Sequence, residues 1–226
     1  MVDAKRFQAQ ELVVPEVLGD VRRLSDSERL TYIAIALERA KDVAASLPDG
    51  ATLYNAFAPL LSFVVANGYF AGCHDTSAVL YMWLCQAGCR EDSMALCIGE
   101  VKGHTGRFDH SWVEVNGKVL DVAVCAPGPN GGFAGGPVFG GMDLGSNTVP
   151  RTKFGVASED ALDDEAATVY GKNLRQYQDF QVSRGYKSMA QLVQEVYGED
   201  GKTLIAKYRD VKRDWRNPTL KPKGPN

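Results

Sequence analysis

Three residues in the middle of this 226-residue chain have the types and the order that thiol chemistry requires. Cys73 follows Ala71-Gly72 at the start of a helical pattern, His110 opens a strand pattern, and Asp121 lies on the next strand pattern. A cysteine thiolate attacks carbonyl carbon, a histidine takes and returns the proton, and a carboxylate orients that histidine. The order predicts a Cys-His-Asp triad that works through a thioester.

A hairpin pattern supports the pairing of the last two residues. Segment 110–124 contains two apolar-polar alternating runs separated by Asn116-Gly117, which is typical of a two-residue type I′ turn. With that turn, His110 and Asp121 are diagonal neighbours on one face of the sheet. A carboxylate bound to one ring nitrogen turns the other nitrogen outward as a base. A register slip of one residue would place Asp121 on the opposite face.

The position of Cys73 distinguishes it from the other cysteines. A helix N-terminus stabilises a thiolate through its unpaired N–H groups and its dipole. The backbone N–H of Cys73 is also a natural donor to an oxyanion. The remaining cysteines lie in apolar patterns and are interpreted as small core residues: Cys85, Cys89, Cys97 and Cys125.

Two auxiliary residues have alternative interpretations. Asn67 precedes Cys73 by six residues, and its side chain is either a second oxyanion donor or the C-cap of the preceding helix. Trp112 shares the face of the triad, where it either shields the His-Asp pair from water or belongs to the core.

A zinc site is the alternative use of the same region. Its ligands would come from Cys73, His74, His104 and His110, but paired ligand spacing of the C-x₂₋₄-C type is missing beside them. We therefore predict no metal and no cofactor. His74 is interpreted as an early helix residue, and His104 as a surface-loop residue.

The surrounding pattern predicts one domain over residues 1–226, with a catalytic core at about 51–126. Helices are expected at 25–46, 54–67 and 73–87, and a strand at 94–101. Segment 127–145 holds eight glycines and three prolines, which predicts a long loop that could cover the cleft as a lid. The helical C-terminal part, 158–216, is expected to contain helices at 158–181, 188–197 and 202–215.

Composition narrows the partners. The net charge of -3 gives no reason to expect nucleic acid, and Lys207 to Lys223 is interpreted as a solvated helix face. Apolar runs stay well below the roughly 20 residues of a membrane span, so no membrane association is predicted. Five cysteines without a secretory signal favour reduced thiols and a cytoplasmic location, with signal-independent export left open. The oligomeric state is also left open.

The motifs resemble the transglutaminase-like branch of the papain-type cysteine enzymes. The residues that carry this resemblance are Gly-Cys73-His-Asp-Thr, His110-Ser-Trp-Val-Glu-Val and Val-Leu-Asp121. The resemblance covers roughly a quarter of the chain. It implies an α+β fold, with a buried helix carrying Cys73 packed on an antiparallel sheet and extra N- and C-terminal helices.

That superfamily performs several reactions with the same thioester chemistry, so the triad does not separate them. The leading expectation is a thiol-dependent amide hydrolase or acyl transferase, most plausibly a cysteine peptidase acting on a peptide or protein. The first rival is a protein glutamine deamidase or transglutaminase, in one scenario a secreted effector. The second rival is a non-catalytic binding module of the same fold.

Overall fold

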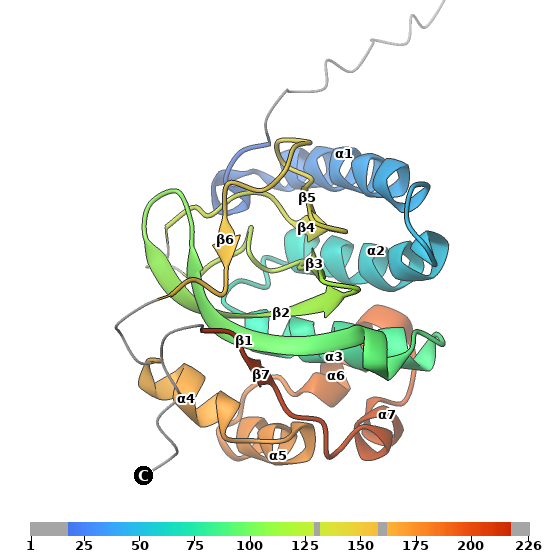
Figure 1. Cartoon of the computed structure of the whole chain (residues 1–226), viewed down its shortest axis with the longest axis vertical. Helices are drawn as coiled ribbons and strands as arrows, with labels where there is room; N and C mark the ends of the chain where they lie inside the picture. Colours follow the sequence, from blue (N-terminus) through green and yellow to red (C-terminus); the bar gives the residue numbers. More distant parts are fainter. Residues whose placement is uncertain (1–17, 129–131, 158–161, 218–226) are drawn as a thin grey trace, which may run out of the picture.

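The computed structural model describes residues 18–128, 132–157 and 162–217, which form a mixed α+β fold. Its centre is a curled antiparallel sheet in the order β3-β2-β1-β6. The two long strands are β1 (Met94–Lys102) and β2 (Arg107–Val115), and the short ones are β3 (Lys118–Leu120) and β6 (Lys153–Phe154). Figure 1 shows β1 and β2 crossing the middle of the molecule in green. The α+β class is therefore confirmed.

The predicted hairpin has the predicted register. Asn116 and Gly117 have φ angles of 50° and 73°, both left-handed as a type I′ turn requires. Val113 pairs with Leu120, so the register has not slipped. Strand β3 is shorter than expected because Asp121 leaves β2 and pairs instead with the next segment of the chain.

The N-terminal helices are α1 (Asp26–Ala44) and α2 (Gly50–Ala66), followed by α3 (Cys73–Gln86). Ser25 and Glu28 form the capping box that starts α1. Helix α3 packs against β2 on one side and α2 on another, and most of its residues are buried. The helix that carries Cys73 is therefore a core element, as the sequence predicts.

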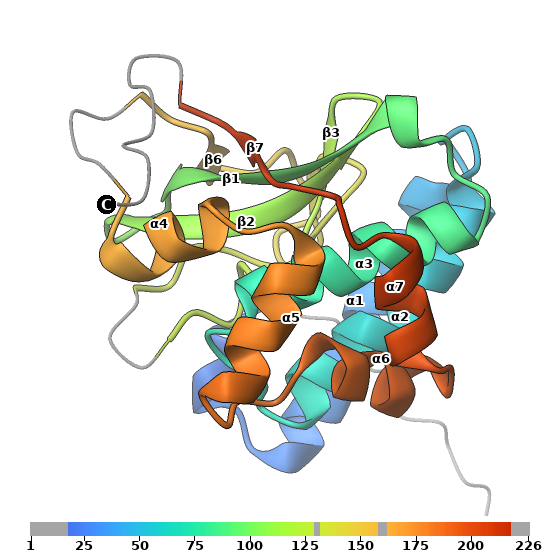
Figure 2. The same ribbon diagram turned by 90° about the horizontal axis from the view of Figure 1, so that it is seen from below.

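The C-terminal helices are α4 (Asp164–Tyr170), α5 (Leu174–Ser183), α6 (Met189–Tyr197) and α7 (Gly201–Lys207). The single helix expected over 158–181 is divided at Gly171, because Asn173 caps a new helix with Gln176. Residues 158–161 of that expected helix lie outside the described residues. Figure 2 shows these helices, orange to red, on the side of the sheet where α3 lies, and α6 contacts α3 directly.

The helix expected over 202–215 is wrong beyond Lys207. Asp214–Trp215 form a short strand, β7, that pairs in parallel with β1 at Cys97 and Ile98. The edge of β1 is available there because β6 pairs only with its far end. Figures 1 and 2 both show β7, in dark red, running beside β1. Arg213, just before β7, is buried rather than on a solvated helix face.

The glycine-rich segment contains secondary structure and buried residues, which a lid over a cleft would not have. It contains β4 (Val138–Phe139) and β5 (Met142–Asp143), which form a small hairpin. Phe139 and Leu144 are fully buried. The Asp143 carboxylate accepts hydrogen bonds from the backbone N–H groups of Gly136 and Gly145. Residues 134–140 and 143–145 are buried in the fold, so the lid prediction is wrong for them; residues 129–131 lie outside the described chain.

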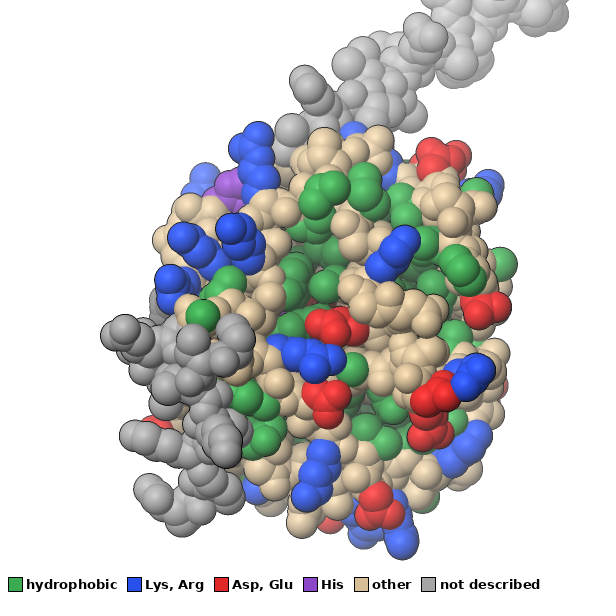
Figure 3. Space-filling model, in the orientation of Figure 1, with side chains coloured by type: hydrophobic (Ala, Val, Ile, Leu, Met, Phe, Trp, Pro, Cys, Tyr) green, Lys and Arg blue, Asp and Glu red, His purple; other side chains and the backbone are tan. Residues whose placement is uncertain are grey.

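The surface in Figure 3 carries both acidic and basic side chains, interspersed with apolar ones. One buried cluster runs continuously from α1 through α3 and the sheet to α7. Across the ranges described here, none of the helices combines the length and apolarity needed to cross a bilayer.

Candidate active site

His110 and Asp121 form a buried hydrogen-bonded pair. The Nε2 atom of His110 lies 2.5 Å from Oδ2 of Asp121, and both side chains are only 3% exposed. The distance matches a charge-assisted hydrogen bond. Because Nε2 is occupied by the carboxylate, Nδ1 is the ring nitrogen left for proton transfer. The diagonal pairing expected from the hairpin is confirmed.

Asp121 is itself held in place by the backbone around it. Its Oδ1 accepts hydrogen bonds from the N–H groups of Ala123 at 2.8 Å and Val124 at 3.2 Å. Its own backbone exchanges two hydrogen bonds with Val138 of β4, at 2.7 and 2.8 Å. The glycine-rich segment therefore serves to fix the acid of the triad.

Aromatic side chains surround the His110 ring. Phe108 contacts it edge-on with ring centroids 5.6 Å apart, and Phe154 lies at 6.2 Å. Trp112 lies parallel to it at 6.5 Å. Trp112 is fully buried, and its indole N–H donates to Glu114. Trp112 therefore belongs to a buried cluster of the core, as one of its two interpretations held, and its ring lies beside that of His110.

Cys73 and His110 both line one cavity of about 190 Å³. The cavity is lined by the triad residues Cys73 and His110, by Ala71 before the helix, and by Ala123 after the acid. Gly72 is the N-cap of α3, and a Cβ on it would lie 2.3 Å from the ring of Tyr69. Only glycine leaves room for Tyr69 against the helix start.

The electrostatics of the site favour a thiolate beside an imidazolium. Burial raises the pKa of Cys73, but the neighbouring rings of His74 and His110 outweigh it and hold that pKa well below 9.0. Burial also opposes the charged form of His110, yet Asp121 and the Cys73 thiolate raise the pKa of His110 from 6.5 to about 10. Such a pair is a preformed nucleophile and acid.

The other cysteines show the opposite behaviour. Burial raises the pKa of Cys85 to about 11 and that of Cys97 to about 12. Burial also raises the pKa of Cys89 and of Cys125. Cys97 and Cys125 are buried, as expected of core residues, and Cys85 and Cys89 are partly buried against the core.

Asn67 does not lie in this cavity. It is the C-cap of α2, exposed, and its side-chain amide donates to the carbonyl of Phe63. The structure favours the cap interpretation, and Asn67 is not placed as an oxyanion donor.

The zinc alternative requires four residues, of which Cys73, His74 and His110 line the cavity and His104 does not. His104 lies on an exposed loop with its ring against Phe133, away from the cavity. In the described ranges, no group of three or more His, Cys, Asp or Glu side chains is arranged to hold a metal ion. His74 is in the first turn of α3, as expected, but its ring lines the cavity, which the sequence analysis did not foresee.

A second network ties the start of α3 to the C-terminal half. The Asp75 carboxylate accepts hydrogen bonds from Tyr69 at 2.6 Å, Tyr177 at 2.5 Å and Gln181 at 2.6 Å. The guanidinium of Arg213 donates to the carbonyl of His74 at 2.9 Å and lies 4.7 Å from the Tyr177 ring. Tyr177, Gln181 and Arg213 are more than 100 residues distant from their partners in sequence, and no local signal could have revealed these contacts.

Three carboxylates line the cavity besides the triad. Asp109 precedes His110 on β2, and Asp163 and Glu165 come from the start of α4. The backbone N–H of Asp163 donates to Asp109 at 2.7 Å, which joins the two elements. The mouth of the site is therefore acidic.

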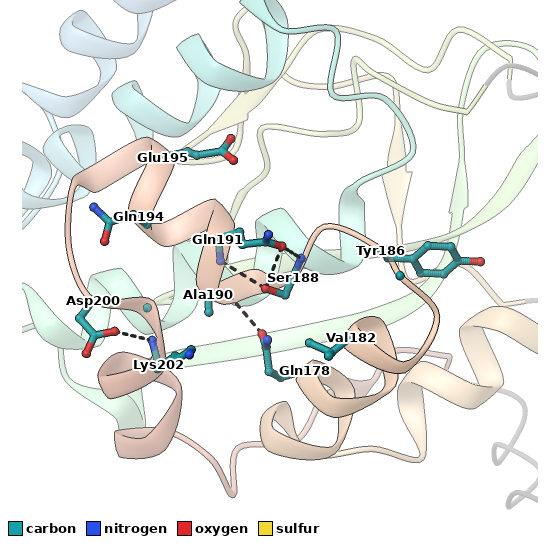
Figure 4. A pocket seen from close by; sticks show the side chains of 12 residues that line it. Gln178, Val182, Tyr186, Ser188, Ala190, Gln191, Gln194, Glu195, Asp200 and Lys202 are labelled. Atoms are coloured by element: carbon teal, nitrogen blue, oxygen red, sulfur yellow. Dashed lines mark hydrogen bonds between the residues drawn. The ribbon is translucent and has the colours of Figure 1, made fainter.

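A larger hollow of about 850 Å³ lies between α5, α6 and α7 (Figure 4). Two of its polar side chains are used by the fold: Gln178 accepts from the Ala190 N–H, and Gln191 accepts from the Ser188 N–H. The residues that line it include no cysteine or histidine. The smaller cavity at Cys73 is therefore the candidate active site.

Comparison of the chain with protein-family models, with curated proteins and with solved structures finds no match.

Proposed function

We propose that this protein is a thiol-dependent amide hydrolase or acyl transferase that works through a thioester, with cysteine peptidase activity as its leading form. The observation that carries the proposal is the buried Asp121–His110 pair, whose histidine lines one cavity with Cys73 at a helix start. The resemblance to the transglutaminase-like branch of the papain-type enzymes supports the same assignment.

The proposed reaction begins with the thiolate of Cys73 adding to an amide carbonyl carbon, while the carbonyl π pair moves to oxygen. The backbone N–H of Cys73 makes no hydrogen bond within the described part of the chain and faces the forming oxyanion. When the oxyanion collapses, the C–N bond breaks and the amine takes the proton of the His110 imidazolium. Neutral His110 then activates water, or an acceptor amine, to cleave the thioester.

The first test is alkylation of the folded protein with iodoacetamide across pH, with the modified residue identified by mass spectrometry. Because the pKa of Cys73 is lowered, we expect its alkylation to stay rapid well below neutrality, where ordinary thiols are protonated. In His110→Ala the imidazolium is gone and burial remains, so the pH at which alkylation begins should rise.

Cys97→Ser is the matched control, since Cys97 is buried, has a raised pKa and lies outside the cavity. Its substitution should leave the alkylation of Cys73 unchanged. Wild-type Cys73 that reacts no faster than a free thiol below neutrality would contradict the proposal.

A further inference from the structure

The Cys73 cavity contains a second imidazole that the triad does not use. His74 is 8% exposed, and its ring is among the side chains that line the cavity. Its ring also helps to lower the pKa of the Cys73 thiol, as the ring of His110 does. For a histidine this buried beside a nucleophile, the question is which ring nitrogen carries the proton.

The hydrogen bond of His74 to Ser111 decides where that proton lies. The Nδ1 atom of His74 is 2.7 Å from Oγ of Ser111, and Ser111 is fully buried. Within the described residues, His74 is the sole hydrogen-bond partner of that hydroxyl. If the hydroxyl accepted from Nδ1–H, its own proton would be buried without an acceptor, which is unfavourable.

The hydroxyl of Ser111 therefore donates to Nδ1, and a neutral His74 ring carries its proton on Nε2. A protonated ring would carry a proton there as well. Among the described residues no oxygen accepts a hydrogen bond from Nε2, so this donor is available to the cavity.

We propose that His74, held by Ser111, is the second oxyanion donor of the site, with its Nε2–H acting beside the backbone N–H of Cys73. This inference rests on the proposed function. In the resting site the Nε2–H is directed at the thiolate. When the sulfur–carbon bond forms, the negative charge moves to the carbonyl oxygen, and the Nε2–H donates to that oxygen. When the π pair returns and the amine leaves, the donor is released; His74 itself neither gains nor loses a proton.

The charged and titratable groups around the His74 ring come from several elements. Its own helix carries Cys73 and Asp75, and strand β2 carries Asp109 and His110. The start of α4 carries Asp163 and Glu165. Arg213 binds the His74 carbonyl. Because these groups also affect the ionisation of Cys73, the test compares rates at pH values where the thiol is fully ionised in every variant.

The experiment uses two reagents on the full chain. Iodoacetamide alkylates Cys73 without forming an oxyanion, whereas p-nitrophenyl acetate acylates it through one; mass spectrometry follows both. In His74→Leu we expect the plateau rate of acylation to fall roughly 10²- to 10³-fold, as for loss of one oxyanion donor. The plateau rate of alkylation should fall by less than about tenfold, since no oxyanion is involved.

Two further variants separate this role from a structural one. His74→Gln retains a side-chain N–H donor and should recover part of the lost acylation. Ser111→Ala keeps the ring but frees its Nδ1 atom, so an intermediate loss of acylation is expected. These two variants also carry the test if His74→Leu does not fold, as judged by thermal unfolding.

The outcomes are distinct. Wild-type protein that is neither alkylated below neutrality nor acylated would contradict the proposed function itself. Wild-type protein that is acylated, with His74→Leu equally fast, would overturn only the assignment of His74. Equal losses of alkylation and acylation in His74→Leu would also overturn it, because His74 would then act on the thiolate alone.

Discussion

At the scale of single residues, the site depends on which atom of each ring carries a proton. His110 binds Asp121 through Nε2, which leaves Nδ1, while His74 binds Ser111 through Nδ1, which leaves Nε2. Both imidazoles line one cavity with Cys73 and bind their buried partners through different ring nitrogens. Each orientation is imposed by a buried partner, so substituting the partner tests the role of the ring.

Asp121→Asn is the sharpest substitution of this kind. Oδ1 of the new side chain would still accept from Ala123 and Val124, so its Nδ2–H₂ group would face Nε2 of His110. Nε2 must then accept, so the ring stays neutral with its proton on Nδ1, and the imidazolium that pairs with the thiolate cannot form. We expect acylation of Cys73 by p-nitrophenyl acetate to fall roughly 10²- to 10⁴-fold.

The matched control is Asp143→Asn, which also alters a buried carboxylate that accepts backbone hydrogen bonds, but outside the cavity. It should affect stability without a comparable loss of acylation by the folded protein. An Asp121→Asn variant that acylates at the wild-type rate would show that the carboxylate does not set the proton position.

Single residues also show which contacts of the site could be predicted from the sequence. The types and order of Cys73, His110 and Asp121 predict that they come together in one site. The Asn116-Gly117 turn fixes the strand register, from which the contact between His110 and Asp121 can be derived. The bond between His74 and Ser111 could not be predicted, since it depends on how a helix side chain meets a strand 37 residues later. The Asn67 assignment rested on proximity in sequence, which did not distinguish a cap from a donor.

At the scale of elements, the C-terminal part of the chain braces helix α3, which carries Cys73. Asp75 in the first turn of α3 binds two side chains of α5, and Arg213 binds the adjacent carbonyl. The first turn of α3, which carries Cys73 and His74, is thus fixed by contacts that lie outside the triad. This brace accounts for a part of the chain that the triad motifs leave unexplained.

Tyr177→Phe tests the brace. It removes one donor from a partly buried carboxylate, and we expect the free energy of unfolding to fall by about 1.5–3 kcal/mol. Urea denaturation measures the change. Tyr186→Phe is the control, because Tyr186 is 58% exposed and its substitution should change that free energy by less than about 0.5 kcal/mol. Equal changes in the free energy of unfolding for the two substitutions would show that the hydrogen bond of Tyr177 to Asp75 does not stabilise the fold.

Element boundaries mark a second limit of sequence interpretation. Helical spacing predicts α1, α3 and α6 well because each carries its own cap signals or apolar pattern. The spacing fails at Asp214–Trp215, where a helical continuation was expected. Those residues form a strand only because β1, more than 100 residues earlier, has a free edge at Cys97 and Ile98.

At the scale of the whole molecule, the charge around the cavity mouth determines which reagents approach easily. Asp109, Asp163 and Glu165 surround an opening that leads to an anionic thiolate. Like charges in a cleft repel an anionic molecule and slow its approach, and salt screens this effect. The net charge of -3 also repels anionic molecules.

We therefore expect iodoacetamide to alkylate Cys73 faster than iodoacetate by more than the ratio for a free thiol. Raising the ionic strength should bring the ratio toward that of the free thiol. Glu165→Gln should lower the ratio at low salt, whereas Glu199→Gln, which is exposed and outside the cavity, should not. A ratio that is independent of salt and of Glu165 would contradict an acidic entrance.

The late position of Arg213 and β7 in the chain has a consequence for how this protein is made. Synthesis proceeds from the N-terminus, so the triad residues leave the ribosome well before the guanidinium that binds the His74 carbonyl and the strand that pairs with β1. A nascent chain can form its hairpin early. Its nucleophile acquires the complete surroundings described here only near the end of translation, which delays full reactivity until the rest of the fold is in place.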